Sequence, residues 1–146
     1  MDLDGILAQW ATDCEIGHNL DVASRETPKL HGQYLGYYIQ AKLLMKRAED
    51  KQQTLLKNKF LWYNGKMSQD EIVDLGWEPD PFNGLKIMKG DLSYYYDSDP
   101  EIQKSEATVV YYKAMVEALK EIIDSLKWRH QTIGNSIRWK QFEAGA

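Results

Sequence analysis

Residues 109–137, VVYYKAMVEALKEIIDSLKWRHQTIGNSI, carry the pattern that decides the fold. Across this stretch, apolar positions and one histidine alternate by three and four residues, which is the spacing of a coiled-coil seam. The seam positions are Val109, Tyr112, Val116, Leu119, Ile123, Leu126, His130, Ile133 and Ile137. Met115 and Ile122 widen the apolar stripe, which favours a helical bundle over an isolated two-stranded rod. The pattern predicts a long helix in which Gly134-Asn135 is a site for a break or bend.

A second long helix is predicted earlier in the chain. Thr27-Pro28 has the form of an N-cap followed by proline at the first helical position, where the missing N–H costs nothing. The same three-four alternation then runs towards Asn64-Gly65, a pair that stops helices. Its members are Leu30, Tyr34, Tyr37, Ala41, Leu44, Ala48, Leu55 and Trp62. Asp99-Pro100 repeats the cap-and-proline signal and should open the last helix.

Shorter segments lie around the two long helices. Apolar residues at helical spacing predict a short amphipathic helix near the start of the chain, ending near Gly17. Ser68 and Glu71 form a capping box that opens another short helix. Residues 77–90 carry two prolines and two glycines and should form a loop, whereas residues 91–97 fit either a helical turn or a strand. The predicted fold is mainly all-α, with long amphipathic helices, a C-terminal coiled-coil-like assembly region and an irregular central segment.

Composition sets limits on the class of protein. The chain has 146 residues and one cysteine, Cys14, which excludes an internal disulfide and any multi-cysteine zinc site. The first residues lack the basic and apolar regions of a signal peptide, and no stretch approaches the roughly 18 consecutive apolar residues of a membrane span. We therefore expect one soluble domain in the cytoplasm, with no membrane partner.

No constellation of catalytic or metal-binding residues stands out. Cys14 and His18 are one helical turn apart, but zinc requires further ligands and Cys14 falls on an apolar stripe. Residues 97–108 begin like a calcium loop, yet they lack glycine at the sixth position and an acid at the twelfth. The chain has no glycine-rich phosphate loop and no dinucleotide fingerprint. We expect no metal, no cofactor and no catalytic site.

The formal net charge of -4 conceals a strong segregation of charge. Residues 1–28 hold one basic and six acidic side chains, whereas residues 29–66 hold eight basic and two acidic ones. Residues 67–106 are again acidic, with three bases and ten acids, and residues 107–146 hold six bases and four acids. Because salt screens charges beyond roughly 10 Å, a partner responds to the local patch more than to the total. The basic segment is a candidate polyanion site, and a solvated helix face is the alternative.

The basic segment ends in an aromatic-flanked stretch, residues 55–66. Cationic surfaces with aromatic faces bind single strands without sequence preference, because lysines neutralise phosphates and bases stack on rings. The candidate residues for binding single-stranded DNA (ssDNA) are Lys42, Lys46, Arg47, Lys57, Lys59 and Lys66. Phe60 and Trp62 are either stacking platforms or core residues, and the seam position of Trp62 favours the core.

Two helices that each carry an apolar seam hold more apolar surface than a small monomer easily buries. We therefore expect self-association through the last helix. The residues predicted for this contact are Val109, Tyr112, Val116, Leu119, Ile123, Leu126, Ile133, Ile137 and Phe142. The alternative is an antiparallel pair in which the two seams bury each other within one monomer.

Three stretches resemble the UvsY-type recombination mediators of tailed phages. TPKLH at residues 27–31 lies at the expected start of a long helix, and LKNK at 56–59 precedes YNGK at 63–66. KQFEAG follows at 140–145, so the resemblance spans most of the chain. The central acidic segment, with Trp77 and its two prolines, resembles the cyanophage branch of the T4-like phages more closely than the enteric-phage pattern.

The resemblance implies a non-enzymatic accessory protein of homologous recombination that acts in the cytoplasm of the infected host. Members of the family bind ssDNA, a RecA-like phage recombinase and the phage ssDNA-binding protein, and they help the recombinase load onto covered strands. They assemble into hexameric or heptameric rings, chiefly through C-terminal helices. We accordingly predict an ssDNA-binding helical region with a central loop at residues 1–98, and a helical oligomerisation region at residues 99–146.

The two functionally important basic residues of the family's Leu-Lys-x-Arg motif map onto Lys57 and Lys59. Lysine in place of the arginine keeps the charge at Lys59 but loses the planar fork that contacts phosphate through two hydrogen bonds. The competing hypothesis is a non-enzymatic helical adaptor or scaffold that oligomerises without binding DNA, with its lysines as a solvated face.

Overall fold

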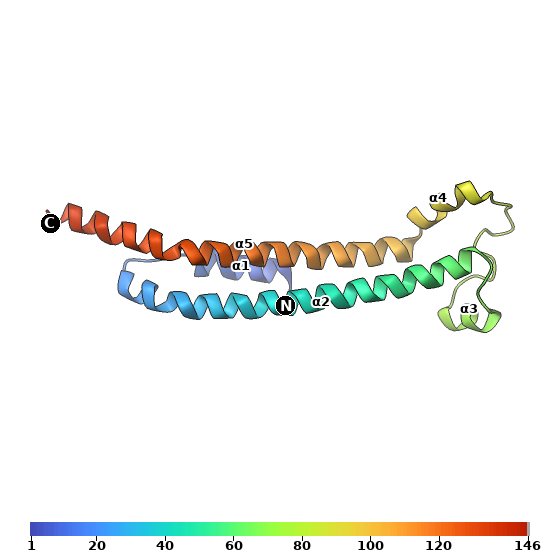
Figure 1. The fold of residues 1–146 in the computed structure, drawn as a ribbon, viewed down its shortest axis with the longest axis horizontal. Coiled ribbons are helices and arrows are strands. Elements are labelled where there is room, and N and C mark those ends of the chain that lie inside the picture. The colour runs from blue at the N-terminus through green and yellow to red at the C-terminus, as the bar shows by residue number, and fades with distance from the viewer. Residues whose placement is uncertain (146) are drawn as a thin grey trace. The chain divides into compact units, whose positions relative to one another are not determined.

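The computed structural model describes residues 1–145, and those residues form helices and no strands. The elements in chain order are α1 (Leu3–Asp13), α2 (Leu20–Tyr63), α3 (Gln69–Leu75), the 3-10 turn η1 (Lys89–Asp91), α4 (Leu92–Asp97) and α5 (Pro100–Glu143). This confirms the predicted all-α class with two long helices and an irregular central segment (Figure 1).

The start of α2 differs from the prediction. The helix begins at Leu20, because the side chain of Asn19 accepts the Val22 amide at 3.1 Å and caps it. Pro28 therefore lies inside the helix, where it removes the main-chain hydrogen bond to the Ser24 carbonyl. Ser24 is exposed, so water can satisfy that carbonyl. The Thr27 hydroxyl donates to the Ala23 carbonyl at 2.8 Å, as an interior helical residue does, and caps nothing.

The other predicted boundaries agree more closely with the structure. α2 ends at Tyr63, just before Gly65 adopts a left-handed φ of 67°, and α3 follows the Ser68 cap. α5 begins at Pro100, as the cap-and-proline signal predicted. It continues through Gly134 to Glu143, so the possible break at that glycine is absent.

The chain divides into two compact units. One comprises Met1–Leu44 together with the residues from Tyr112 onward, and the other comprises Met45–Tyr111. Both long helices contribute to both units, so the first unit is built from two separate stretches of sequence, whereas the second is continuous. The division into an ssDNA-binding region at residues 1–98 and an oligomerisation region at residues 99–146 stays a prediction.

In the first unit, α1 lies along α2 and α5 (Figure 1) and the three helices share one core. Tyr34, Met115 and Leu119 are fully buried at its centre. The Trp10 ring meets the Tyr34 ring edge-on at 5.4 Å between centroids. The Tyr34 hydroxyl donates to the Asp13 carboxylate at 2.8 Å, and burial together with that hydrogen bond raises the pKa of Tyr34.

Much of the predicted seam of the last helix is buried within this one chain. Leu119, Ile123 and Leu126 belong to the core shared with α1 and α2, and Ile133 is also buried. Tyr112 and Val116 pack partly against the same core. At these positions the seam packs within one chain, as expected from the alternative in which two antiparallel helices of one monomer bury each other's seams. Ile137 and Phe142, the last two predicted contact residues, are exposed.

Substituting Leu119→Ala should lower the free energy of unfolding by about 2–5 kcal/mol, because it opens a cavity in a fully buried site. The matched change Leu43→Ala, at a leucine that is 63% exposed on α2, should alter it by less than about 0.5 kcal/mol. Urea unfolding followed by circular dichroism measures both. Equal losses for the two variants would contradict the assigned core.

Candidate nucleic-acid interface

The second unit brings the end of α2 against the start of α5. Residues 64–99 lead from one helix to the other and include α3 and α4, which lie near the end of α2 (Figure 1). Aromatic side chains fill the region between these elements. The Tyr63 ring has its centroid 5.8 Å from that of Phe82 and 5.0 Å from that of Tyr96, and Phe82 meets Tyr95 edge-on at 5.0 Å. This cluster holds the irregular segment to the helices.

Lys59 lies in the interior of this unit and is 3% exposed. Its ammonium is 3.1 Å from the Asp99 carboxylate and 3.4 Å from the Glu101 carboxylate. Two indole rings flank it, with the Trp77 centroid at 4.0 Å and the Trp62 centroid at 4.6 Å. Two acids compensate the loss of hydration, and the ring faces add cation–π attraction.

Asp99 uses its two carboxylate oxygens for different tasks. Oδ1 accepts the amides of Glu101 at 2.9 Å and Ile102 at 3.1 Å, which caps the N-terminus of α5. Oδ2 accepts the Tyr63 hydroxyl at 2.6 Å and faces the Lys59 ammonium. Burial disfavours the carboxylate, but these hydrogen bonds and the lysine charge together hold the pKa of Asp99 below its usual range. Burial, with this hydrogen bond, raises the pKa of Tyr63.

The other predicted DNA-binding residues are exposed. Lys57 lies on the last turns of α2, and the Lys66 ammonium lies 5.7 Å from the centroid of the Phe60 ring, which is 49% exposed. Within residues 1–145, neither Lys57 nor Lys66 has a carboxylate within 4.0 Å. We call Lys57, Phe60 and Lys66 the basic–aromatic surface.

The three remaining predicted cations lie earlier on α2. Arg47 is exposed, and Lys46 pairs with Asp50 at 2.8 Å, which raises the pKa of Lys46 through that hydrogen bond. Lys42 belongs to the first unit and lies 5.3 Å from the centroid of the Tyr38 ring. Of the six predicted cations, the structure thus buries Lys59 alone and leaves the others open to solvent.

Sequence reasoning missed the partners of Lys59. The Asp99-Pro100 signal identified the cap of α5, but nothing local indicated that the second oxygen of Asp99 binds a lysine 40 positions earlier. Trp62 has a mixed environment, since it is half-buried against Trp77 and its indole N–H donates to the Glu78 carbonyl at 2.8 Å. The core interpretation of its seam position therefore holds only in part, because the ring packs against Trp77 but the side chain is not fully buried.

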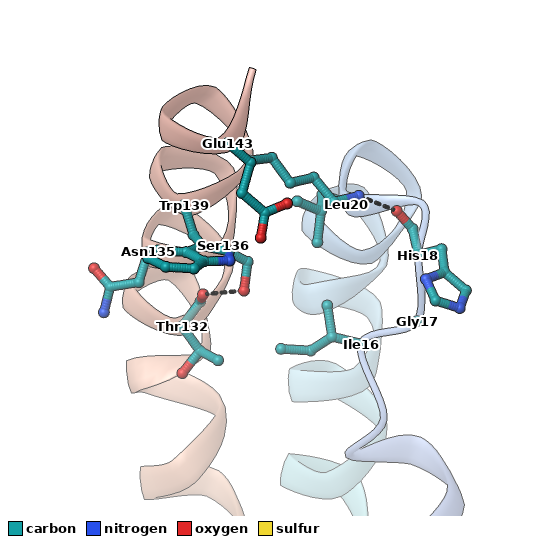
Figure 2. A pocket seen from close by; sticks show the side chains of 10 residues that line it. Ile16, Gly17, His18, Leu20, Thr132, Asn135, Ser136, Trp139 and Glu143 are labelled. Carbon is teal, nitrogen blue, oxygen red and sulfur yellow. Dashed lines mark hydrogen bonds between the residues drawn. The ribbon is translucent and has the colours of Figure 1, made fainter. Parts of the chain in front are cut away.

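The first unit has a groove of about 640 Å³ between the α1–α2 connection and the last turns of α5. Figure 2 shows Ile16 and Leu20 facing Trp139 across it, and the Lys140 ammonium donates to the His18 carbonyl at 3.1 Å. Ile137, Trp139 and Phe142 expose apolar surface on these last turns of α5, with Phe142 70% exposed. This helix end is a candidate contact surface.

No group of three or more His, Cys, Asp or Glu side chains suited to a metal ion occurs within residues 1–145. Cys14 is exposed, so the apolar-stripe interpretation of that position was wrong. Over the same residues, no helix is both long enough and apolar enough to cross a membrane.

The lowered pKa of Asp99 predicts a pH dependence of stability. Unfolded aspartate titrates near pH 3.9, so the contribution of this carboxylate is complete above about pH 4 and is lost as the pH falls through its folded value. Asp99→Asn should cost about 2 kcal/mol at pH 7, because the cap survives but the ion pair does not. The difference in unfolding free energy between the two proteins should narrow at pH 3, as urea titrations can measure. A difference independent of pH would contradict this account.

Comparisons with known proteins agree with this architecture. Two crystal structures of the bacteriophage T4 recombination mediator protein UvsY share the fold. Lattice type II has a TM-score of 0.81 at 19% identity and covers 99% of this chain and 98% of that chain. Lattice type IV has a TM-score of 0.78 at 17% identity, with coverages of 98% and 99%.

No curated protein sequence matches the chain. The family described as "Recombination, repair and ssDNA binding protein UvsY", by contrast, matches residues 9–146, nearly the whole length. The chain therefore belongs to the UvsY family.

Proposed function

We propose that this protein is a non-enzymatic recombination mediator that binds ssDNA and helps a RecA-like phage recombinase load onto strands covered by ssDNA-binding protein. Family membership supports the role in recombination. The observation that carries the DNA-binding part is the basic–aromatic surface, which presents two unpaired lysines around an exposed phenylalanine ring. The site of action would be the cytoplasm of the infected host.

The basic–aromatic surface suits a flexible strand of any sequence. Lys57 and Lys66 would neutralise phosphates and release counterions, while Phe60 would stack on a base. Arg47 would add a further phosphate contact in the same unit, and Lys46 a weaker one because Asp50 already pairs with it. Lys42, in the other unit, would contact the strand separately.

We further propose that the protein acts as a homo-oligomeric ring of six or seven subunits. The supporting observation is the set of apolar side chains left exposed on the last turns of α5, above all Trp139 and Phe142. Several copies of the basic–aromatic surface on one particle would bind a strand far more tightly than one copy does. Wrapping the strand over the ring would strain or displace the covering protein, while another surface recruits the recombinase.

Replacing Lys57 and Lys66 by glutamine should weaken binding to oligo-dT and reduce its salt dependence, because log K changes by about 0.7 per log unit of salt for each phosphate contact on single strands. Phe60→Ala should cost about 1–3 kcal/mol per stacked base with little change in that slope. Fluorescence anisotropy at several salt concentrations measures both effects. Lys120→Gln, at an exposed lysine of the other unit, is the control. Absence of strand binding by the wild type at low salt would favour the scaffold hypothesis.

The double variant Trp139→Glu with Phe142→Glu should reduce the particle mass in light scattering, because it places charge on the proposed contact surface. Both residues are exposed, so the helical content of the subunit should not change. A particle of unaltered mass would rule out this part of α5 as the assembly surface.

A further inference from the structure

We propose that Lys59 is a positioning residue for strand binding, which acts through Asp99 and never touches the DNA. This inference rests on the proposed function, because it concerns the same basic–aromatic surface. It separates the roles of two lysines that lie two positions apart: Lys57 contacts the strand, and Lys59 holds in place the helix end that carries Lys57.

Lys59 is unavailable to a phosphate. Its ammonium is enclosed by the two carboxylates of Asp99 and Glu101 and by the faces of Trp62 and Trp77. Reaching a strand would require leaving both acids and both rings, and it would leave the Asp99 carboxylate buried without its cation. The side chain is therefore committed to the interior.

The ion pair between Lys59 and Asp99 connects two helix ends. Asp99 is the cap of α5, and the same carboxylate binds Lys59 and the Tyr63 hydroxyl from the last turns of α2. The end of α2 is thereby tied to the start of α5 through the buried Asp99 carboxylate, and Glu101 gives Lys59 a second, more exposed partner on α5. Because Asp99 is itself held by the amides of Glu101 and Ile102, it offers a fixed partner to Lys59.

The basic–aromatic surface lies at the end of α2 that this ion pair holds. At about 100° per residue, Lys57 points about 160° away from Lys59 around the axis of α2, and Phe60 about 100° away. Lys66 follows the turn at Gly65, and its amide donates to the Leu61 carbonyl at 2.8 Å. Releasing Lys59 from Asp99 would therefore displace all three groups together.

Asp99→Asn should change the affinity for a strand in the direction opposite to that expected from charge alone. Asp99→Asn removes a negative charge, which by itself should strengthen the binding of a polyanion. Asparagine still caps a helix, so α5 can begin normally. If Lys59 acts through Asp99, the variant should instead bind oligo-dT about tenfold more weakly, with an unchanged salt slope.

The decisive experiment compares Lys59→Met, Asp99→Asn and the double variant with the wild type, using anisotropy of labelled oligo-dT at several salt concentrations. Each single variant should lose affinity without a change of slope. The double variant should regain most of the lost affinity. It places a methionine between the two indoles and a neutral asparagine opposite, so no buried charge is left without a partner. Lys57→Met is the contrast and should lower the slope by about 0.7 for each phosphate that the variant no longer neutralises.

Two further readouts separate positioning from loss of the fold. The particle mass and helical content of each variant should match the wild type, and tryptophan emission should change in Lys59→Met because a cation between two indoles is removed. That change should shrink in a Trp77→Phe background, in which Trp62 is the one indole left beside position 59. If Lys59→Met does not fold, the direction in which Asp99→Asn changes the affinity for oligo-dT tests the proposal by itself.

Three outcomes would overturn the inference: a reduced salt slope for Lys59→Met, tighter strand binding by Asp99→Asn, or a double variant as weak as Lys59→Met. Failure of the proposed function gives a different result. In that case the wild type and Lys57→Met alike fail to bind oligo-dT at low salt.

Discussion

The carboxylate of Asp99 is the interaction on which the second unit depends. One oxygen satisfies amides at the start of α5, and the other binds Tyr63 and Lys59 at the end of α2. A buried ion pair is stable only when both partners are well compensated. Here the compensation is complete on both sides, since amides and a hydroxyl support the acid while Glu101 and two indoles support the lysine.

The buried ion pair between Lys59 and Asp99 explains how the short basic motif at residues 56–59 can serve two purposes. Residues two apart on a helix point about 200° from each other, so Lys57 and Lys59 cannot share a surface. The interior holds one of them in an aromatic cage, and the other remains free at the exposed end of the helix. Charge counts along the chain treat the two lysines as equal. Their environments differ, because Lys59 stabilises the interior and Lys57 is available to bind phosphate.

The heptad pattern of α5 likewise serves more than one purpose along its length. Leu119, Ile123 and Leu126 pack against α1 and α2 and so complete the core of a single chain. Beyond Ile133 the helix carries its aromatic residues on the outside. A regular seam therefore does not by itself say whether the partner is another helix of the same chain or another subunit. The short helix α1 covers part of the apolar surface of the two long helices, and its residues Ile6 and Trp10 pack into that core.

The sequence by itself determined the all-α class, the two long helices, the Gly65 stop and the Asp99-Pro100 start, because helical periodicity and capping are local properties. It also located the basic stretch that carries Lys57 and Lys66. Local signals were misleading at Thr27-Pro28, where the Asn19 cap starts the helix about two turns earlier. Only the tertiary structure decided that Lys59 is buried, because burial depends on which side of α2 meets α5 and on Trp77, which the central segment brings close.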